Sequence, residues 1–203
     1  MRCAALGALD RMGSLRGDAL VDALADPDAA VRRRACVLAG RGLALGDTRV
    51  AADALLRALS SDRDPSVVEC AAWAMGEAGS KCGRPEVDAL ELVVRTHVDP
   101  LCREAAVAAL GAVSGALGAV SGAVGESGAV GESGAVGESG AVGESGVLDT
   151  VLFALEDKPA VRRRATIALA AFDDPRVDAA LQRCLKDRDW QVRQAAEDLL
   201  GRS

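Results

Sequence analysis

A short phrase recurs along this chain of 203 residues and constrains its fold more than any other feature. Each copy has an acidic residue, an aliphatic anchor five positions later, often an arginine next to the anchor, and an alanine four positions beyond the anchor. The anchors, at positions 1, 31, 67, 102, 161 and 192, are separated by 30, 36, 35, 59 and 31 residues. Four of these five steps have the length of one helical hairpin. The copies start at Asp26, Asp62, Glu156 and Asp187, with a looser one at His97 and one without an acidic residue at Met1.

The anchors begin segments that have one apolar helical face. Apolar or small residues recur at intervals of four, three and one, as in residues 67, 71, 74 and 75, which predicts a helix that we name helix B. A second amphipathic stretch, helix A, precedes each full copy, and an acidic turn joins the two, as in residues 62–65. Aspartate in this turn caps free N–H groups, which is worth about 1 kcal/mol, and proline is tolerated in the first turn of helix B.

One hairpin cannot bury its apolar face alone, so successive hairpins are expected to stack into an all-α superhelix, or solenoid. Many of the interface positions are alanine or glycine, which let helices approach closely. We expect about five and a half hairpins, in residues 1–110, where the first hairpin lacks its A helix, and in residues 147–203.

The repeated phrase resembles HEAT repeats, particularly the short bacterial kind known as PBS-lyase-like HEAT repeats. The clearest copy is residues 187–196, with the sequence DRDWQVRQAA, and the resemblance covers nearly everything except residues 111–146. It implies a HEAT/armadillo-type solenoid and a ladder in which the turn aspartate pairs with the arginine of helix B in a neighbouring repeat. The matching positions are Asp28, Asp64, Asp99 and Asp189, together with Arg2, Arg32, Arg103, Arg162 and Arg193. We interpret these residues as structural.

Two positions depart from this ladder pattern. Val68 stands where arginine is expected, and Lys158 stands where aspartate is expected. We therefore expect the ladder to be interrupted at both positions.

Residues 111–146 form a low-complexity insert, in which the hexad Ser-Gly-Ala-Val-Gly-Glu occurs four times in tandem from Ser121 to Glu144. We expect a surface loop between helix B of one repeat and helix A of the next. Three alternatives are less favoured. A collagen-like helix has the right glycine period but no proline, a left-handed β-helix would have little more than one coil, and a membrane span at residues 105–125 would contain only six leucines or valines.

The residue types present exclude several classes of site. A single histidine, His97, rules out the His-Glu ligand pairs of the iron hydroxylases of hypusine formation, which are built from similar repeats. Six cysteines form no C-x-x-C pair, and five of them lie in apolar helical patterns; only Cys82 lies in a loop-like stretch. We predict no catalytic residue, no cofactor and no metal site.

The net charge of −6 counts against general nucleic-acid binding. Four of the acids, at positions 126, 132, 138 and 144, belong to the insert, so the remaining 26 acidic and 24 basic residues leave the solenoid at −2. The exclusion of nucleic acid therefore rests more on the scarcity of aromatic residues and on the mixed charge of the B helices.

Charged residues of the B helices are the candidate partner-binding positions, because B helices line the concave face of such solenoids. We select Arg33, Glu69, Glu104 and Arg163, with Trp73 beside Glu69 as a possible anchor. The arginines, together with Arg34 and Arg164, would contact an acidic partner segment. The competing interpretation is a solvated helix face and a tryptophan packed between repeats.

We predict a non-enzymatic scaffold whose concave B-helix face binds a protein or peptide segment. A bilin lyase or its chaperone is the alternative, and a HEAT-like DNA-binding or repair protein is a weaker one. No secretion-signal pattern opens the chain, so we expect a cytoplasmic protein without membrane contact. The first B helix lacks its A partner and neither end has a polar capping repeat, which leaves self-association or a missing N-terminal extension open.

Overall fold

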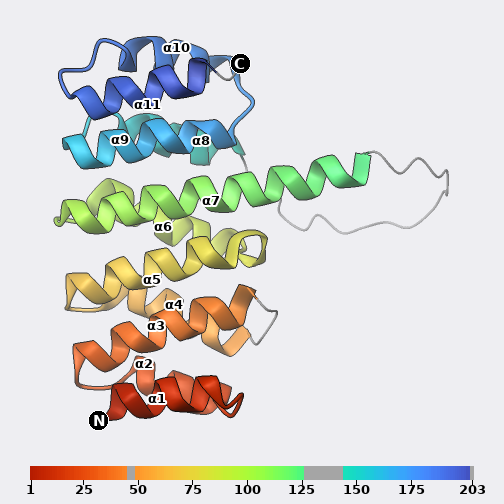
Figure 1. Ribbon diagram of the computed structural model, residues 1–203, viewed down its shortest axis with the longest axis vertical. Helices are drawn as coiled ribbons and strands as arrows, with labels where there is room; N and C mark the ends of the chain where they lie inside the picture. Colours follow the sequence, from red (N-terminus) through yellow and green to blue (C-terminus); the bar gives the residue numbers. More distant parts are fainter. Residues whose placement is uncertain (45–48, 126–143, 202–203) are drawn as a thin grey trace.

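The computed structural model describes residues 1–44, 49–125 and 144–201, whose helices stack along one axis with the two ends of the chain at opposite ends of the stack (Figure 1). Over these residues the chain forms eleven α-helices and two short 3-10 turns, η1 (Gly79–Lys81) and η2 (Leu169–Ala171). The helices are α1 (Arg2–Arg11), α2 (Gly17–Leu24), α3 (Ala29–Ala44), α4 (Arg49–Ser61), α5 (Pro65–Ala78), α6 (Arg84–Thr96), α7 (Pro100–Gly125), α8 (Glu144–Ala154), α9 (Pro159–Ala168), α10 (Pro175–Cys184) and α11 (Trp190–Leu200).

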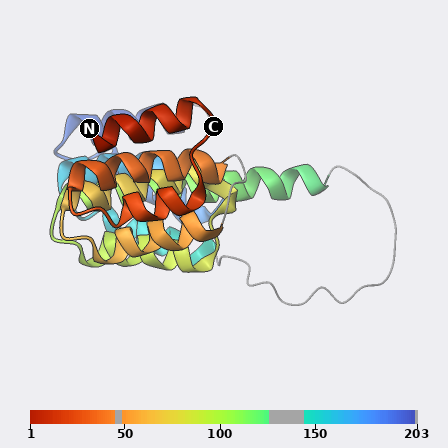
Figure 2. The ribbon, with the colours of Figure 1, turned by 90° about the horizontal axis from the view of Figure 1, so that it is seen from below.

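The helices form two layers. The even-numbered helices are the predicted A helices and the odd-numbered helices are the predicted B helices, which lie in front in Figure 1. Helix α3 packs on α5, α5 on α7 and α7 on α9, while α2 packs on α4, α4 on α6 and α6 on α8. In Figure 2, which looks along the stack from below, the helices of successive hairpins overlie one another within each layer. The all-α superhelix of about five and a half hairpins is therefore confirmed.

Local signals in the turns explain where the helices begin. Asp64, Asp174 and Asp189 precede α5, α10 and α11, and each carboxylate accepts a hydrogen bond from the backbone N–H two residues later. Proline occupies the first turn of α5, α9 and α10, where its missing N–H has no helical partner to lose. The predicted acidic turns thus act as helix starts.

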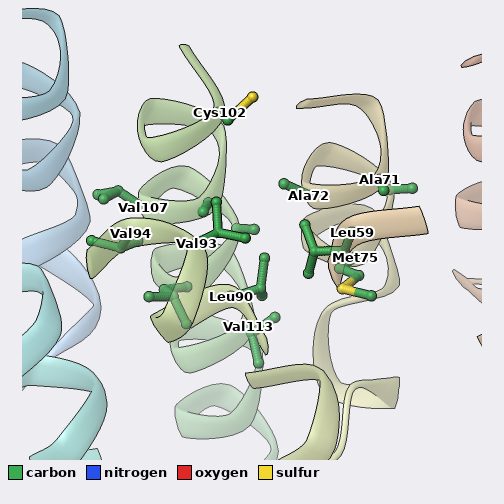
Figure 3. Packing of buried hydrophobic residues seen from close by; sticks show 14 of the residues in the cluster. Leu59, Ala71, Ala72, Met75, Leu90, Val93, Val94, Cys102, Val107 and Val113 are labelled. Atoms are coloured by element: carbon green, nitrogen blue, oxygen red, sulfur yellow. The ribbon is translucent and has the colours of Figure 1, made fainter. Parts of the chain in front are cut away.

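One apolar cluster runs through the stack between the two layers. Its members are mainly leucine, valine and alanine, and the largest side chains with almost no exposed surface include Leu55, Leu90 and Leu110. Figure 3 shows part of this cluster, with Leu59 and Met75 of one hairpin and other side chains of the next extending into the space between the helices. Each hairpin therefore completes its core against its neighbours.

Glycine and alanine set the distance between successive B helices. A glycine nine positions after one anchor meets an alanine seven positions after the next anchor. A Cβ atom at Gly40 would lie 2.8 Å from Cα of Ala74, and one at Gly111 would lie 2.9 Å from Cβ of Ala168. Because these gaps leave no room for a methyl group, the small residues at these crossings are required for the close stacking. The three pairs are Gly40 with Ala74, Gly76 with Ala109, and Gly111 with Ala168.

Helix α7 corrects the predicted start of the insert. We expected a loop from residue 111, but α7 continues to Gly125, and its last part extends beyond the other helices (Figures 1 and 2). Val113 and Ser114 are buried, and Gly111 faces α9. The first residues after the predicted boundary are therefore helical, because they pack against α9 of the next hairpin. Helix α8 begins at Glu144, before the predicted boundary at 147, and residues 126–143 of the tandem hexads lie outside the described residues.

Residues 100–117 of α7 are long and apolar enough, by length and composition only, to cross a membrane. In this fold, however, 39 % of that stretch is buried inside the protein. Val107, Leu110 and Val113 belong to the apolar cluster between the layers. Part of the apolar character of α7 is therefore used in the core of the stack.

Candidate functional site

Arginine side chains join successive hairpins through a ladder of ion pairs, each of which we call a rung. In the rung between α3 and the next turn, Nε and Nη2 of Arg32 donate to the two carboxylate oxygens of Asp62 at 2.7 and 2.8 Å. The third nitrogen, Nη1, donates to the backbone carbonyl of Asp26 in the arginine's own turn at 2.8 Å. Equivalent rungs join Arg2 to Asp26, Arg103 to Asp157 and Arg162 to Asp187.

The carboxylates of the ladder are not the ones expected. The predicted aspartates instead cap their own helices, because the carboxylate of each accepts a hydrogen bond from the backbone N–H two residues later. In three of the turns, the aspartate that bridges to the preceding hairpin lies two positions before the capping aspartate. Its carboxylate also accepts a hydrogen bond from the backbone N–H of that capping aspartate. The capping residues are Asp28, Asp64, Asp99 and Asp189.

Val68 interrupts the ladder, as expected. Its side chain is buried, and the bridging position in the next turn is occupied by His97, whose Nδ1 accepts a hydrogen bond from the N–H of Asp99 at 3.1 Å. At this rung, valine therefore replaces the arginine and histidine replaces the bridging aspartate. The interruption expected at Lys158 is absent, because Asp157, one residue earlier, accepts the two bonds from Arg103.

The rungs stabilise the charged form of their carboxylates. The hydrogen bond from Arg103 lowers the pKa of Asp157, and the bond from Arg162 lowers the pKa of Asp187. Burial alone would raise the pKa of Asp62, but the bonds from Arg32 and from the N–H of Asp64 lower it overall. Arg193 of α11 keeps the bond to its own turn, from Nη1 to the Asp187 carbonyl at 2.7 Å. These residues are structural in the geometry observed.

A groove of about 610 Å³ lies between α5 and α7 on the B-helix layer, and we name it the α5–α7 groove. On α5 it is lined by Glu69, Trp73 and Glu77, which are four residues apart and so share one face of the helix. Leu101 lines it on α7. Trp73 is 44 % exposed and Leu101 is 54 % exposed, so the groove presents two large apolar side chains to water.

Small residues form the floor of the α5–α7 groove. Ala108 and Ala112 also line an adjacent groove between α7 and α9, of about 330 Å³, which includes the half-exposed side chain of Ile167. The two grooves share these alanines and Arg164. A partner segment could therefore approach the helix backbones closely along both grooves.

The charged residues of the groove divide into a paired group and an unpaired group. Glu104 of α7 receives both Arg163 and Arg164 of α9, with nitrogen–oxygen distances of 3.7 and 3.4 Å. Nε of Arg164 is buried and has no hydrogen-bond acceptor among the residues placed by the structure. Glu69 and Glu77 form no ion pair within that same part of the chain. The charges without a partner here are thus negative.

The structure brings together three of the five predicted partner-binding residues. Glu69, Trp73 and Glu104 line the α5–α7 groove, whereas Arg163 reaches it only through Glu104 and Arg33 is exposed on α3 outside the lining. The sequence analysis missed other lining residues, among them Leu101, Glu77 and the small floor residues. The spacing of four residues from Trp73 was the signal that could have found Glu77.

The cysteines are free thiols, and four of the six are buried. Cys82, the one expected in a loop, follows η1 with a buried side chain whose Sγ donates to the Met75 carbonyl at 3.2 Å. Burial raises the pKa of Cys36 and Cys82 to about 12 and that of Cys102 to about 11. Across the described ranges, no group of three or more His, Cys, Asp or Glu residues is arranged to hold a metal ion.

A family model described as HEAT repeats matches residues 17–111 and 132–201. The chain belongs to the HEAT-repeat family. This HEAT-repeat protein is similar in fold to the complex of CpcE and CpcF of phycocyanin lyase from Nostoc sp., with a TM-score of 0.62 and 17 % identity. The match covers 92 % of this chain and 98 % of that chain. The family model thereby confirms the predicted HEAT repeats, and the likeness to the phycocyanin lyase complex is one of fold.

Two further solved structures match the HEAT-repeat protein with lower TM-scores. YibA of Escherichia coli has a TM-score of 0.41 and 18 % identity, covering 96 % of this chain and 73 % of that chain. Human deoxyhypusine hydroxylase in complex with glycerol has a TM-score of 0.32 and 20 % identity, covering 98 % and 88 %. No curated protein matches the chain.

Proposed function

We propose that this HEAT-repeat protein is a non-enzymatic scaffold that binds a protein or peptide segment in the α5–α7 groove on its B-helix face. The exposed indole of Trp73 inside a groove with an alanine floor is the observation that carries the proposal. Tryptophan is enriched among residues that dominate binding energy, and a partner that covers the indole removes apolar surface from water.

The chemistry of the α5–α7 groove favours binding over catalysis. Its only thiol, Cys70, has a pKa raised by burial, which favours the less nucleophilic protonated form. The glutamates of the lining have no histidine near them in the groove with which to form a proton-transfer pair. A cytoplasmic location is part of the proposal, since all six cysteines are free thiols.

Affinity capture from a cell lysate with matched tryptophan variants tests the scaffold function. We expect the wild type and Trp190→Ala to retain the same prey and Trp73→Ala to lose it, because Trp190 is also exposed but lies at the start of α11, outside the groove. Circular dichroism controls for folding. Retention of the same prey by Trp73→Ala would show that the α5–α7 groove is not the binding site.

A chromophore lyase subunit or its chaperone is the second candidate function. It is favoured by the likeness of fold to the phycocyanin lyase complex. The purified protein is mixed with a free bilin and its absorbance spectrum is recorded. A shift in the bilin absorbance supports this second candidate and overturns the scaffold-only function, whereas an unchanged spectrum supports the scaffold.

A further inference from the structure

Three glutamates line the α5–α7 groove, and among the residues that the structure places, ion-pair partners are present for just one of them, Glu104. Glu104 holds the two arginines of α9 that were predicted to contact a partner. Arg34 of α3 is not available either, because its guanidinium lies against Gly7 of α1, with Nη2 3.2 Å from the position of a Cβ there. Of the four arginines counted as partner contacts in the sequence, three therefore lie against other parts of the protein, and the fourth, Arg33, is exposed but lies outside the groove lining.

The uncompensated charge has a definite spacing on α5. Glu69 and Glu77 lie four residues before and four residues after Trp73, so the exposed stripe reads acid, tryptophan, acid. At 1.5 Å per residue the two glutamates are separated by about 12 Å along the helix axis. Neither carboxylate has a cationic partner within the described part of the chain.

From this stripe we propose that the partner is an amphipathic helical segment carrying basic residues on either side of an apolar one. A helix that lies along α5 places an apolar residue on Trp73 and, four residues to either side, lysine or arginine opposite Glu69 and Glu77. The alanine floor of α7 lets such a helix approach closely. The inference rests on the proposed scaffold function and reverses the sign of the partner expected from the arginine clusters.

Two fluorescent helical peptides of 15 residues test the sign of the partner. One carries lysine at positions 4 and 12 and leucine at position 8, and the other carries glutamate in place of both lysines. We expect the wild-type protein to bind the lysine peptide about five- to tenfold more tightly by fluorescence anisotropy at low salt, the range for two exposed ion pairs. Added salt reduces this ratio because exposed charges are screened.

Two double variants of the protein separate the groove from its net charge. In Glu69→Gln with Glu77→Gln we expect the preference for the lysine peptide to disappear. Glu156→Gln with Glu197→Gln makes the same change in net charge at exposed positions outside the α5–α7 groove and keeps the preference. A third double variant, Glu69→Lys with Glu77→Lys, reverses the charge at both groove positions and shifts the preference to the glutamate peptide.

Each outcome decides between the proposals. Equal binding of the two peptides, tighter binding of the glutamate peptide, or binding of neither at 1 mM peptide overturns the basic helical partner. If a Trp73-dependent prey is nevertheless captured from lysate, the scaffold function stands and only the partner's chemistry is wrong. If neither the peptides nor the prey depend on Trp73, the scaffold function at this groove fails as well.

Discussion

Arg103 of α7 donates two hydrogen bonds to the carboxylate of Asp157, with distances of 2.6 and 2.7 Å, across a sequence separation of 54 residues. Both side chains are largely buried, at 14 % and 17 % exposure. The pair therefore joins the hairpins on the two sides of the tandem hexads, and the solenoid continues across the longest step in the repeat spacing.

Removing one member of this rung is expected to destabilise the fold. We expect Arg103→Gln and Asp157→Asn each to lower the free energy of unfolding by about 2 kcal/mol, because each leaves a partly buried charge without its partner. In urea denaturation, the double variant should lose less than the sum of the single variants. Arg176→Gln, which removes exposed ion pairs with Asp149 and Asp174, is the control and should cost less than either of these variants, because exposed ion pairs contribute little. Additive losses at Arg103 and Asp157 would contradict a direct interaction.

The interrupted rung can be restored by design. Val68→Arg alone should destabilise the protein by about 2 kcal/mol or more, since it places an arginine at a buried position without a carboxylate. Combining it with His97→Asp supplies the carboxylate at the bridging position. Thermal and urea denaturation should show that the double variant recovers at least about 1 kcal/mol relative to Val68→Arg. A double variant no more stable than that single variant would mean that this turn cannot present a bridging aspartate.

Two glycines of α7 should respond oppositely to the same substitution. A Cβ at Gly111 would lie 2.9 Å from Cβ of Ala168, whereas one at Gly115 would lie 3.8 Å from Cβ of Ala171. We expect Gly111→Ala to lower the free energy of unfolding by about 1–3 kcal/mol through overpacking. Gly115→Ala should raise it by up to about 1 kcal/mol through helix propensity. Denaturation midpoints measure both, and equal effects would contradict the close crossing of α7 and α9.

The ion-pair ladder predicts how the free energy of unfolding falls at low pH. The folded state lowers the pKa of Asp157 and Asp187, so their contribution is complete above the unfolded pKa of about 3.9 and is lost as pH falls through the lower folded value. The arginines stay charged throughout. We expect the wild type to lose stability below about pH 4 more steeply than Asp157→Asn with Asp187→Asn. Urea titrations between pH 6 and pH 2.5 measure the two slopes, and identical slopes would contradict this prediction.

Thiol reactivity should follow burial. Cys36, Cys82 and Cys102 have pKa values raised to about 11–12 by burial, so little thiolate is present at pH 8. With an aromatic disulfide reagent at pH 8, we expect the fastest reaction at the partly exposed Cys3, and a slower one at Cys70, which is also partly exposed but whose pKa is raised by burial. The remaining thiols should react after unfolding in urea. Rapid modification of Cys82 in the native protein, identified by mass spectrometry of its peptide, would contradict the buried position after η1.

Much of the fold could be read from local patterns. The spacing of Val67, Ala71 and Met75 predicts one helical face. The pair Asp64-Pro65 just before this face predicts the start of α5 at Pro65. Both signals depend on residues within two helical turns of each other. The hairpin count followed from them because each hairpin needs a neighbour to cover its apolar face.

The groove could be predicted only in part. Glu69 and Trp73 share a helix, so their common face follows from spacing. Leu101 joins them only because α7 packs on α5, and Arg164 only because α9 packs on α7. The ion pairs of Arg163 and Arg164 with Glu104 likewise could not be predicted, because they join residues about 60 positions apart in the chain.

The sequence by itself determined the helical period, the capped turns, the solenoid class and the break in the ladder at Val68, since these follow from interactions between near neighbours in the chain. Only the tertiary structure decided that Asp62 and not Asp64 bridges the hairpins, and that Gly111 belongs to the packed stack. The same holds for which glutamates of the groove keep an unpaired charge. These outcomes depend on where one hairpin places its side chains against the next, and spacing along the chain does not contain that register.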